Sequence, residues 1–529
     1  MSAQSRQIAD PHEPLQAPPP ARLASETDGT AAEASARAAT SEARLARRRD
    51  CAEALSALMP AHCILATPEA LRPYESDGLT ALSATPLLVA LPETVEQVQA
   101  LMRWARDAGV PVVARGAGTG LSGGALPHEE GILLGLARFS RILELDPERG
   151  FARVEPGVRN LAISDAARPH GLYYAPDPSS QIACSIGGNV AENSGGVHCL
   201  KYGLTVHNVL ALKVVTIDGD LLEIGGQGPD AAGYDLLALL TGSEGMLAVT
   251  VEVTVKLLPE PPVAKLVMAA FASVRDAGDA VGDIIAAGIV PAGLELMDSP
   301  AIKAAEAFAR CGYPLDAAAV LLCELDGLAE EVDAQIERVS EVLRTRRATT
   351  LHVATGEAER LLLWKGRKSA FPAVGRLAPD YYCIDGTIPR RQLAHVLQRM
   401  EQLSAEYELP IANVFHAGDG NLHPLIMFDA NAPGELHRTE ELGSRILQLC
   451  VEVGGTVTGE HGVGVEKINE MCVQFDPDTL TQFHAVKAAF DPDGHLNPGK
   501  AVPTLQRCAE FGAMHVHGGK LPFPDLERF

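Results

Sequence analysis

The sequence predicts an α+β protein in which a glycine-rich N-terminal part precedes an α+β sandwich. Two observations carry this prediction. Up to about residue 260, short apolar strands alternate with helical segments and with clusters of glycine. Beyond that point, longer segments with helical periodicity are separated by strands, a pattern typical of sheets covered by helices. The length of 529 residues is sufficient for roughly three domains of about 150 residues each.

The first half contains a predicted strand at 86–94, a helix at 95–109 that ends at Gly109, and strands at 110–115 and 131–136. Further short strands are expected at 152–158, 171–176 and 250–262. Prolines follow the last of these strands, so we place a domain boundary near residue 260.

The second half is predicted to be richer in helix. Helical periodicity is found at 274–288, 327–347, 391–407 and 435–453. Strands are expected between the helices, for example at 318–325 and 411–418. A terminal helix and turn are expected within 488–500, followed by a tail at 501–529.

Composition excludes several classes of protein. Hydrophobic residues make up 47% of the chain and charged residues 21%, which is typical of a globular protein and excludes a fully disordered one. No run of about 18 apolar residues is present, so we expect no membrane-spanning helix. The formal net charge of −24 opposes contact with the phosphates of DNA or RNA, so we expect no nucleic-acid partner.

Residues 1–50 differ from the rest of the chain. They are rich in alanine and proline and include no aromatic residue, so they cannot bury enough apolar surface to offset the entropy of ordering. We therefore expect a disordered tail. The arginines at 47–49 are not followed by an apolar segment, and acidic residues are scattered before them, so we predict neither a signal peptide nor a transit peptide.

The ten cysteines include no Cys-x-x-Cys pair. This spacing argues against a zinc ribbon and against a ferredoxin-type iron–sulfur cluster. Without a signal peptide, we expect a reducing compartment and no framework of disulfides.

A glycine cluster, RGAGTGLSGGA, occupies residues 115–125. Such a loop lets the backbone approach a ligand closely, and its N–H groups suit an anion such as a pyrophosphate. The literal G-x-G-x-x-G match is not a Rossmann fingerprint, because Pro127 and a strand follow where that fold needs a helix. A flexible loop is the alternative, but flexible linkers rarely lie between two apolar strands.

Two more glycine-rich segments follow, at 184–203 and 241–247. Several segments of close backbone approach within one domain indicate a large, extended ligand. A dinucleotide has that shape.

Histidines and a carboxylate form a second constellation. His416 and His423 are separated by Gly-Asp-Gly-Asn, a strong turn signal, so a hairpin can bring both imidazoles to one point. Glu460 and His461 lie between glycines in TGEHGVG. Two histidines and one carboxylate are typical of a divalent metal site, with Zn²⁺ or Fe²⁺ as candidates. A lone histidine is more often a structural residue, but two glycine-flanked motifs favour the metal site.

The segments RGAGTGLSGGA, PDPSSQIACSIGGNVAENSGG and TGSEGML resemble the FAD-binding domain of the vanillyl-alcohol-oxidase type of flavoproteins. Residues 363–393 and 507–524 are similar to the FAD-linked subunits of glycolate oxidases, also called glycolate dehydrogenases. The resemblance extends from about residue 51 to the C-terminus. It implies that two α+β subdomains at 51–260 hold FAD and that a cap at 261–500 supplies the substrate site.

The resemblance also implies the roles of particular residues. Metal ligands would be His416, His423 and Glu460, with zinc the usual metal, and His461 would be the catalytic base. Arg367 would bind the substrate carboxylate, with Arg376 as a fallback. The residues implied to bind FAD are Arg115, Gly116, Ala117, Gly118, Thr119, Gly120, Ser122, Gly123, Gly124, Pro178, Ala183, Gly187, Gly188, Asn189, Asn193, Gly195, Gly196, Tyr202, Gly203, Glu244, Gly245 and Asn497.

The implied activity is oxidation of glycolate to glyoxylate, with hydride transfer from Cα to flavin N5. Related enzymes that act on a dicarboxylate have extra polar side chains where this chain has Phe371, Cys383 and Leu425, so a small substrate with one carboxylate is expected. D-lactate or another small D-2-hydroxy acid is the alternative, because one methyl group is worth only about 1–3 kcal/mol of discrimination. Covalent attachment of the flavin, for which His198 is the candidate, is the less favoured arrangement.

Electrons must then leave the flavin, and the chain has no pattern for a cluster or a heme. The resemblance implies a glycolate oxidase complex with a second FAD-domain subunit and an iron–sulfur subunit that pass electrons to membrane quinone. We expect a cytoplasmic protein that meets the inner membrane through these partners. Two other classes remain as alternatives: a flavin-free metal hydrolase and a non-catalytic assembly subunit.

Overall fold

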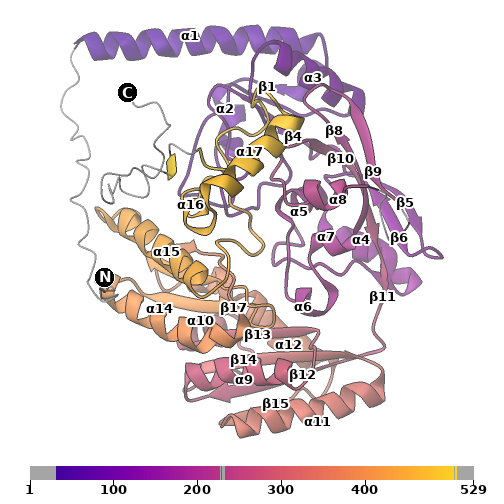
Figure 1. Cartoon of the computed structure of the whole chain (residues 1–529), viewed down its shortest axis with the longest axis vertical. Coiled ribbons are helices and arrows are strands. Elements are labelled where there is room, and N and C mark those ends of the chain that lie inside the picture. The colour runs from indigo at the N-terminus through magenta and orange to yellow at the C-terminus, as the bar shows by residue number, and fades with distance from the viewer. Residues whose placement is uncertain (1–30, 227, 229–232, 505–506, 509–529) are drawn as a thin grey trace, which may run out of the picture. The chain divides into compact units, whose positions relative to one another are not determined.

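A computed structural model describes residues 31–226, 228, 233–504 and 507–508 (Figure 1). The chain divides into two compact units, residues 1–47 and residues 48–529. Residues 31–47 begin helix α1 (Ala31–Ser56), which differs from the disordered tail predicted through residue 50. Alanine has the highest helix propensity, so a segment too poor in apolar residues for a core can still be helical. The rest of the predicted tail, residues 1–30, lies outside the described residues.

The second unit begins with a four-stranded sheet of order β1-β2-β4-β3. Strands β2, β4 and β3 run parallel, and α3 connects β2 to β3 as the sequence predicted. Thr94 caps α3, since its hydroxyl accepts from the Gln97 N–H, and Gly109 follows the helix with φ +62°. The bounds are β1 (Ile64–Leu65), α2 (Pro68–Leu71), β2 (Leu88–Ala90), α3 (Val95–Asp107), β3 (Val112–Arg115) and β4 (Ile132–Gly135).

A five-stranded antiparallel sheet of order β5-β6-β10-β8-β9 follows. Apolar side chains of α4, α5 and α8 join its core. The bounds are β5 (Ile142–Asp146), β6 (Phe151–Val154), α4 (Asn160–Ala167), β7 (Leu172–Tyr173), α5 (Ile186–Glu192), α6 (Cys199–Tyr202), α7 (Thr205–Asn208), β8 (Val209–Val215), β9 (Leu221–Gly225), α8 (Leu236–Leu240), β10 (Val249–Lys256) and β11 (Leu258–Pro259). These two sheets and their connecting loops are the two α+β subdomains that the sequence predicted.

The third sheet has seven strands in the order β15-β12-β14-β13-β17-β18-β16. One hydrophobic cluster joins it to α9, α11, α14 and α15, and another joins it to α10, α12 and α13, so helices cover both faces. The bounds are β12 (Val263–Phe271), α9 (Val274–Ala286), β13 (Gly293–Asp298), α10 (Ser299–Ala309), β14 (Ala319–Gly327), α11 (Ala329–Thr345), β15 (Thr350–Val353), α12 (Glu357–Lys368), α13 (Ala370–Val374), β16 (Asp380–Cys383), α14 (Leu393–Tyr407), β17 (Ile411–Phe415), β18 (Pro424–Phe428) and α15 (Glu435–Glu452). The predicted α+β sandwich is confirmed.

The chain then returns to the first sheet. After α16 (Met471–Gln474) comes α17 (Pro477–Phe490), which begins earlier than the predicted terminal helix, because Asp476 caps it and a proline occupies its first turn. The segment after α17 pairs with β3: the Val112 N–H donates to the His495 carbonyl, and the Asn497 N–H donates to the Val112 carbonyl. Residues 491–500 therefore belong to the wall of the FAD-binding part, where the sequence analysis had assigned them to the cap.

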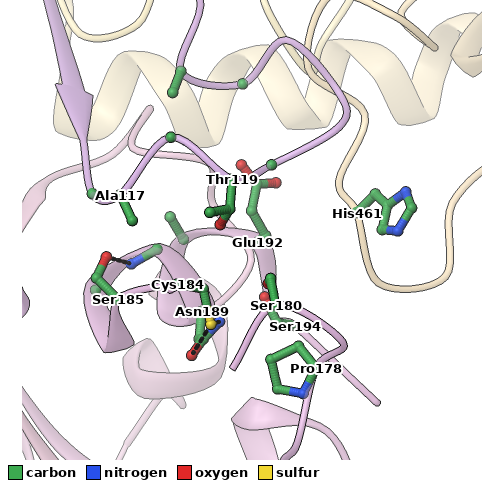
Figure 2. A pocket seen from close by; sticks show the side chains of 18 of the residues that line it. Ala117, Thr119, Pro178, Ser180, Cys184, Ser185, Asn189, Glu192, Ser194 and His461 are labelled. Atoms are coloured by element: carbon green, nitrogen blue, oxygen red, sulfur yellow. Dashed lines mark hydrogen bonds between the residues drawn. The ribbon is translucent and has the colours of Figure 1, made fainter. Parts of the chain in front are cut away.

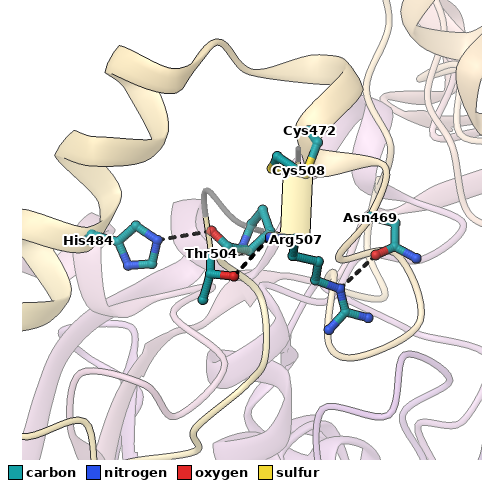
Figure 3. Close-up of a disulfide and its surroundings, with 7 residues drawn as sticks. Asn469, Cys472, His484, Thr504, Arg507 and Cys508 are labelled. Carbon is teal, nitrogen blue, oxygen red and sulfur yellow. Dashed lines mark hydrogen bonds between the residues drawn. A yellow bond between two sulfur atoms is a disulfide. The ribbon is translucent and has the colours of Figure 1, made fainter. Parts of the chain in front are cut away.

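A disulfide joins Cys472 in α16 to Cys508, 36 residues further along (Figure 3). Beside the disulfide, the Arg507 Nε donates to Asn469 Oδ1 at 2.7 Å, so a hydrogen bond also links residue 507 to the loop before α16. The other eight cysteines of the described chain are buried. The sequence analysis expected no framework of disulfides, and this pair departs from that expectation, because a spacing of 36 residues gives no local signal.

No helix in the described ranges is both long enough and apolar enough to cross a bilayer.

Candidate active site

A cavity of about 430 Å³ lies between the glycine-rich loops and the third sheet. The loop after β3 and the start of α5 form one end, and His423, Glu460 and His461 line the other. Figure 2 shows His461 on a separate loop from the glycine-rich segments that carry Ala117 and Ser185. The glycine-rich segments and the histidine–carboxylate group that were identified in the sequence therefore line the same cavity.

Two glycines show why this loop needs the smallest residue. A Cβ at Gly116 would lie 2.2 Å from Ser185 Oγ, and Gly118 has φ +71°, which L-residues rarely adopt. A Cβ at Gly120, by contrast, would meet no atom within 4 Å and would project into the cavity. One side of the loop therefore packs tightly against the protein, while the backbone on its other side remains open to a ligand.

Most of the predicted FAD-binding residues line this cavity. The lining set is Arg115, Gly116, Ala117, Gly118, Thr119, Gly120, Gly124, Pro178, Gly187, Gly188, Asn189, Glu244 and Gly245. The predicted residues that do not line it are Ser122, Gly123, Ala183, Asn193, Gly195, Gly196, Tyr202, Gly203 and Asn497.

Several of the residues outside the lining hold the cavity walls in place. Asn193 ends α5 with φ +52°, and the Tyr202 hydroxyl donates to Asp326 at 2.6 Å. The Asn497 side-chain amide donates to the Gly124 carbonyl at 3.1 Å. The Tyr202 and Asn497 contacts join distant segments of the chain, so they support the fold around the site without facing the cavity.

Other lining residues were missed in the sequence. They are mostly small and polar, and include Ser179, Ser180, Cys184, Ser185, Glu192 and Ser194. A signal was available for Ser185, because a serine before Ile-Gly-Gly is a helix N-cap, and its hydroxyl accepts from the Gly188 N–H at 3.4 Å.

The predicted histidine hairpin is present. Strands β17 and β18 pair antiparallel, and a bridge between His416 and Asn421 closes the turn. The rings of His416 and His423 lie 5.0 Å apart between centroids. Glu460 Oε1 lies 3.0 Å from His423 Nε2 and 3.3 Å from His416 Nε2, so the three donor atoms converge.

This donor set fits a divalent metal ion. The His416 Nδ1 lies 2.8 Å from Glu295 Oε1, so this carboxylate holds Nδ1 and leaves Nε2 as the ring nitrogen that faces Glu460 and that would bind a metal once deprotonated. Burial raises the pKa of Glu460, but the His416 charge outweighs this effect and holds the pKa well below its usual range. The carboxylate is therefore ionised, as a metal ligand must be.

Two further groups of donor atoms lie within coordinating reach. Cys383, His423 and His461 form one at the same place, where burial raises the pKa of the Cys383 thiol well above its ordinary value. That shift disfavours the thiolate, so His416, His423 and Glu460 are the better set. His62, Cys63 and Glu93 form the other group, and there Arg138 pairs with Glu93.

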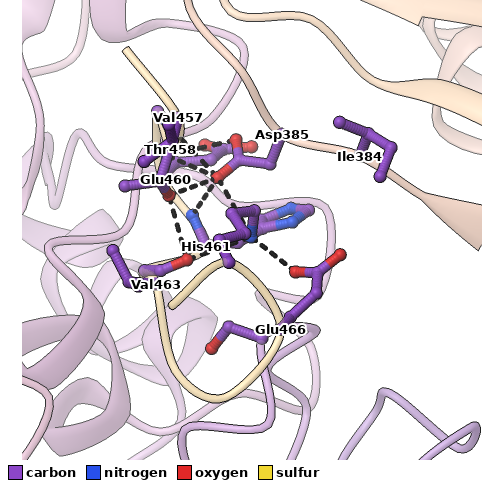
Figure 4. Close-up of polar contacts among 12 residues, drawn as sticks. Ile384, Asp385, Val457, Thr458, Glu460, His461, Val463 and Glu466 are labelled. Atoms are coloured by element: carbon purple, nitrogen blue, oxygen red, sulfur yellow. Dashed lines mark hydrogen bonds and ion pairs between the residues drawn. The ribbon is translucent and has the colours of Figure 1, made fainter. Parts of the chain in front are cut away.

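The loop that carries Glu460 and His461 is held by two buried carboxylates, Asp385, which was not predicted from the sequence, and Glu244, which was predicted there only as an FAD-binding residue. Asp385 accepts from the Thr458 hydroxyl at 2.7 Å and from the backbone N–H of His461 at 2.9 Å (Figure 4). Glu244, with φ +52°, accepts from two further N–H groups of the loop, those of residues 463 and 464, both at 2.7 Å. The glycine-rich domain and the third sheet therefore fix the loop together.

His461 lies beside the candidate metal ligands. Its ring stacks on His423 with centroids 4.9 Å apart. Burial lowers its pKa to about 4, so the imidazole is uncharged at neutral pH. Its Nδ1 is shielded and has no hydrogen-bond partner in the described chain, and the residue lines the cavity.

Arg367 is fully buried in α12 and does not line the cavity. Its Nη2 lies 2.5 Å from Glu295 Oε2. The next residue, Lys368, does line the cavity and lies 3.6 Å from Asp177 Oδ2. Arg376 is exposed, with its guanidinium 4.9 Å from the Phe308 ring centroid, so the structure does not place this fallback at the site.

Of the remaining predicted positions, Phe371 lines the cavity, whereas Cys383, Leu425 and His198 do not. Phe371 lines the cavity and packs edge-on against His423, 5.8 Å between centroids. Cys383 and Leu425 are buried at a β16–β18 pair and add no charge to the pocket. His198 does not line the cavity, and both of its ring nitrogens face carboxylates, so it is not free to attach a flavin.

The chain matches two family models and several proteins of known description. Residues 86–225 match the family model of the FAD binding domain, and residues 260–501 match that of the FAD linked oxidases, C-terminal domain. The chain is 65% identical over 476 residues to the glycolate oxidase subunit GlcD of Escherichia coli K12, covering 90% of this chain and 95% of that protein. GlcD of Bacillus subtilis is 39% identical, over 81% of this chain and 91% of that protein. The D-lactate dehydrogenase of Archaeoglobus fulgidus is 33% identical, over 80% and 93%.

Solved structures share the fold at low identity. P-cresol methylhydroxylase with bound substrate gives a TM-score of 0.73 at 18% identity, covering 87% of this chain and 98% of that chain. Alkyldihydroxyacetonephosphate synthase gives 0.66 at 17% identity, covering 85% and 84%.

The fold and the cavity together define an FAD-linked oxidoreductase. The chain belongs to the FAD-linked oxidase family of the vanillyl-alcohol-oxidase type, as the glycine-rich motifs predicted. This membership removes the flavin-free hydrolase and the non-catalytic subunit as alternatives.

Proposed function

We propose that this chain oxidises glycolate to glyoxylate. The observation that carries the proposal is the neutral His461, which faces the same cavity as the FAD-binding glycine loops and adjoins the His423–Glu460 pair. The 65% identity to a glycolate oxidase subunit supports the substrate. FAD, when bound, supplies the acceptor for the hydride that leaves Cα.

Each group of residues has a separate role in the proposed reaction. His416, His423 and Glu460 would hold a divalent metal, for which the donor set suits zinc, and the metal would lower the pKa of the substrate hydroxyl. His461, whose neutral imidazole lines the cavity, accepts the hydroxyl proton. Glycine loops at one end and the histidine loop at the other fix the distance between cofactor and base, and such positioning is worth up to about 7–11 kcal/mol.

Of the adjacent cations Arg367 and Lys368, Lys368 is the one placed to meet the substrate carboxylate. Arg367 is fully buried, pairs with Glu295 and does not line the cavity. Lys368 is the cation that lines the cavity beside Phe371. With no further charge contributed by Cys383 or Leu425, the pocket suits one carboxylate and a short chain.

The test is anaerobic mixing of the purified FAD-loaded protein with glycolate, D-lactate and L-lactate, followed at 450 nm. We expect glycolate to bleach the flavin fastest and L-lactate slowest. The D-lactate dehydrogenase relative makes D-lactate the second candidate, and faster bleaching by D-lactate would select it. No bleaching by any of the three would refute the proposal.

Electrons then pass to partners. The proposal includes a second FAD-domain subunit and an iron–sulfur subunit, which carry electrons to quinone at the cytoplasmic face of the inner membrane. The support is that the relative in Escherichia coli is named as a subunit of glycolate oxidase, and that the sequence has no Cys-x-x-Cys pair. The chain alone should reduce a soluble dye with glycolate but should not reduce quinone; full quinone reduction by this chain alone would contradict the partner assignment.

A further inference from the structure

Glu295 connects the two halves of the site. It lies in β13, the strand that pairs with β17 just before the histidine hairpin. Its side chain is 1% exposed. One carboxylate oxygen, Oε1, lies 2.8 Å from His416 Nδ1, and the other, Oε2, lies 2.5 Å from Arg367 Nη2.

The contact with His416 holds the imidazole ring in one orientation and favours one tautomer. His416 donates from Nδ1 to Glu295, which turns Nε2 toward Glu460 at 3.3 Å. A carboxylate behind a metal-binding imidazole holds the ring orientation and makes the ligand more basic. Without Glu295, the Nδ1–H of a 3% exposed histidine would lose its acceptor.

The contact with Arg367 holds the positive charge of this buried guanidinium in place. Arg367 is fully buried, and within the described residues Glu295 is its only ion-pair partner. Because Glu295 is mounted on a central strand, both contacts share one rigid support. The imidazole and the guanidinium therefore keep a fixed separation.

We propose that Glu295 is a positioning residue that turns the His416 ring toward Glu460 and keeps the Arg367 charge at a fixed separation from that ring. It acts through these two residues and does not touch substrate. The inference rests on the proposed function for the choice of substrate, whereas its metal-binding half can be tested separately.

The test compares Glu295→Gln and Glu295→Asp with Asp298→Asn. Asp298 is a matched control, since it lies on the same strand, is also buried, and accepts from Asn413 Nδ2 at 2.7 Å instead of contacting the site. Each FAD-loaded protein is stripped with a chelator and titrated with Zn²⁺ against a chromophoric competitor. Anaerobic mixing with glycolate then gives the substrate Kd and the limiting rate of flavin reduction separately.

For Glu295→Gln we expect zinc affinity to fall about 10–100-fold. The glycolate Kd should rise even when excess zinc restores the limiting rate, and Glu295→Asp should recover part of both losses. Asp298→Asn should bind zinc as the wild type does. Wild-type zinc affinity in Glu295→Gln, or an equal loss in Asp298→Asn, would overturn the inference.

The double variant Glu295→Gln/Arg367→Gln guards against a simple folding defect, because it removes the buried charge that the single variant leaves unpaired. It should fold at least as well as Glu295→Gln yet keep the low zinc affinity. Recovery of wild-type zinc affinity would show that Glu295 only balances Arg367, which contradicts the inference. If glycolate fails to reduce the wild type, the proposed function fails, while the zinc titrations still decide the role of Glu295.

Discussion

His198 lies between two carboxylates from distant parts of the chain, and its replacement has a calculable effect on stability. Its Nδ1 lies 3.0 Å from Asp177 Oδ2, and its Nε2 lies 3.3 Å from Glu324 Oε1. Burial lowers the pKa of the imidazole, but the two carboxylates outweigh burial and raise it to about 10. An unfolded histidine titrates near 6.5, so between these values the folded protein binds one more proton than the unfolded chain.

The sign of the pH effect follows from this difference. The stabilisation is fully present below about pH 6.5 and is lost as the pH rises through about 10, at nearly 1.4 kcal/mol per pH unit. Replacing His198 by glutamine removes this term. The advantage of the wild type over the variant in free energy of unfolding should therefore shrink by about 2.5 kcal/mol between pH 7 and pH 9.

Urea unfolding followed by far-ultraviolet circular dichroism, with FAD saturating in both proteins, measures this difference. His352→Gln is the matched control, because His352 also pairs with a carboxylate, Glu359 at 2.7 Å, but both side chains are more than a third exposed. Such an exposed pair contributes at most about 1 kcal/mol. A wild-type advantage over His198→Gln that stays constant from pH 7 to pH 9 would refute the reasoning.

Two other predictions concern the cavity and the C-terminal segment. Lys368 lines the cavity, and its replacement by glutamine should raise the Kd of glycolate in anaerobic reduction by about tenfold, which corresponds to one charged hydrogen bond. Lys365 on the same helix is exposed and lies outside the cavity lining, so Lys365→Gln should leave the Kd unchanged. Equal Kd values in the two variants would show that the carboxylate is bound elsewhere. Cys508→Ser opens the 36-residue loop closed by the disulfide and should lower the free energy of unfolding by about 2–4 kcal/mol. Identical urea midpoints for the wild type with and without dithiothreitol would contradict that prediction.

Local patterns in the sequence predicted much of the fold and the centre of the site. The turn Gly-Asp-Gly-Asn predicted the hairpin that brings His416 and His423 together, because turn chemistry acts within a few residues. The glycine cluster at 115–125 predicted a ligand-facing loop between two strands for the same reason. Helix periodicity located α3, α9, α14 and α15 to within a few residues.

Features that depend on distant residues could not be predicted. Glu295 contacts His416 across 121 residues, and nothing in the local sequence ELMD marks that contact. Asp385 and Glu244 hold the histidine loop from 76 residues and about 220 residues away, respectively. Helix α1 differs from the predicted tail for another reason: its alanines are too small to build a core, yet they have the highest helix propensity.

Anaerobic stopped-flow reduction of His461→Asn by glycolate tests the central claim most directly. Wild type and variant should bind equal amounts of FAD, because His461 lies at the end of the cavity opposite the glycine loops. Loss of the group that removes the hydroxyl proton should slow the 450 nm bleaching by about 10²–10⁴-fold. A bleaching rate within a few-fold of the wild type would contradict the assignment of His461 as the base.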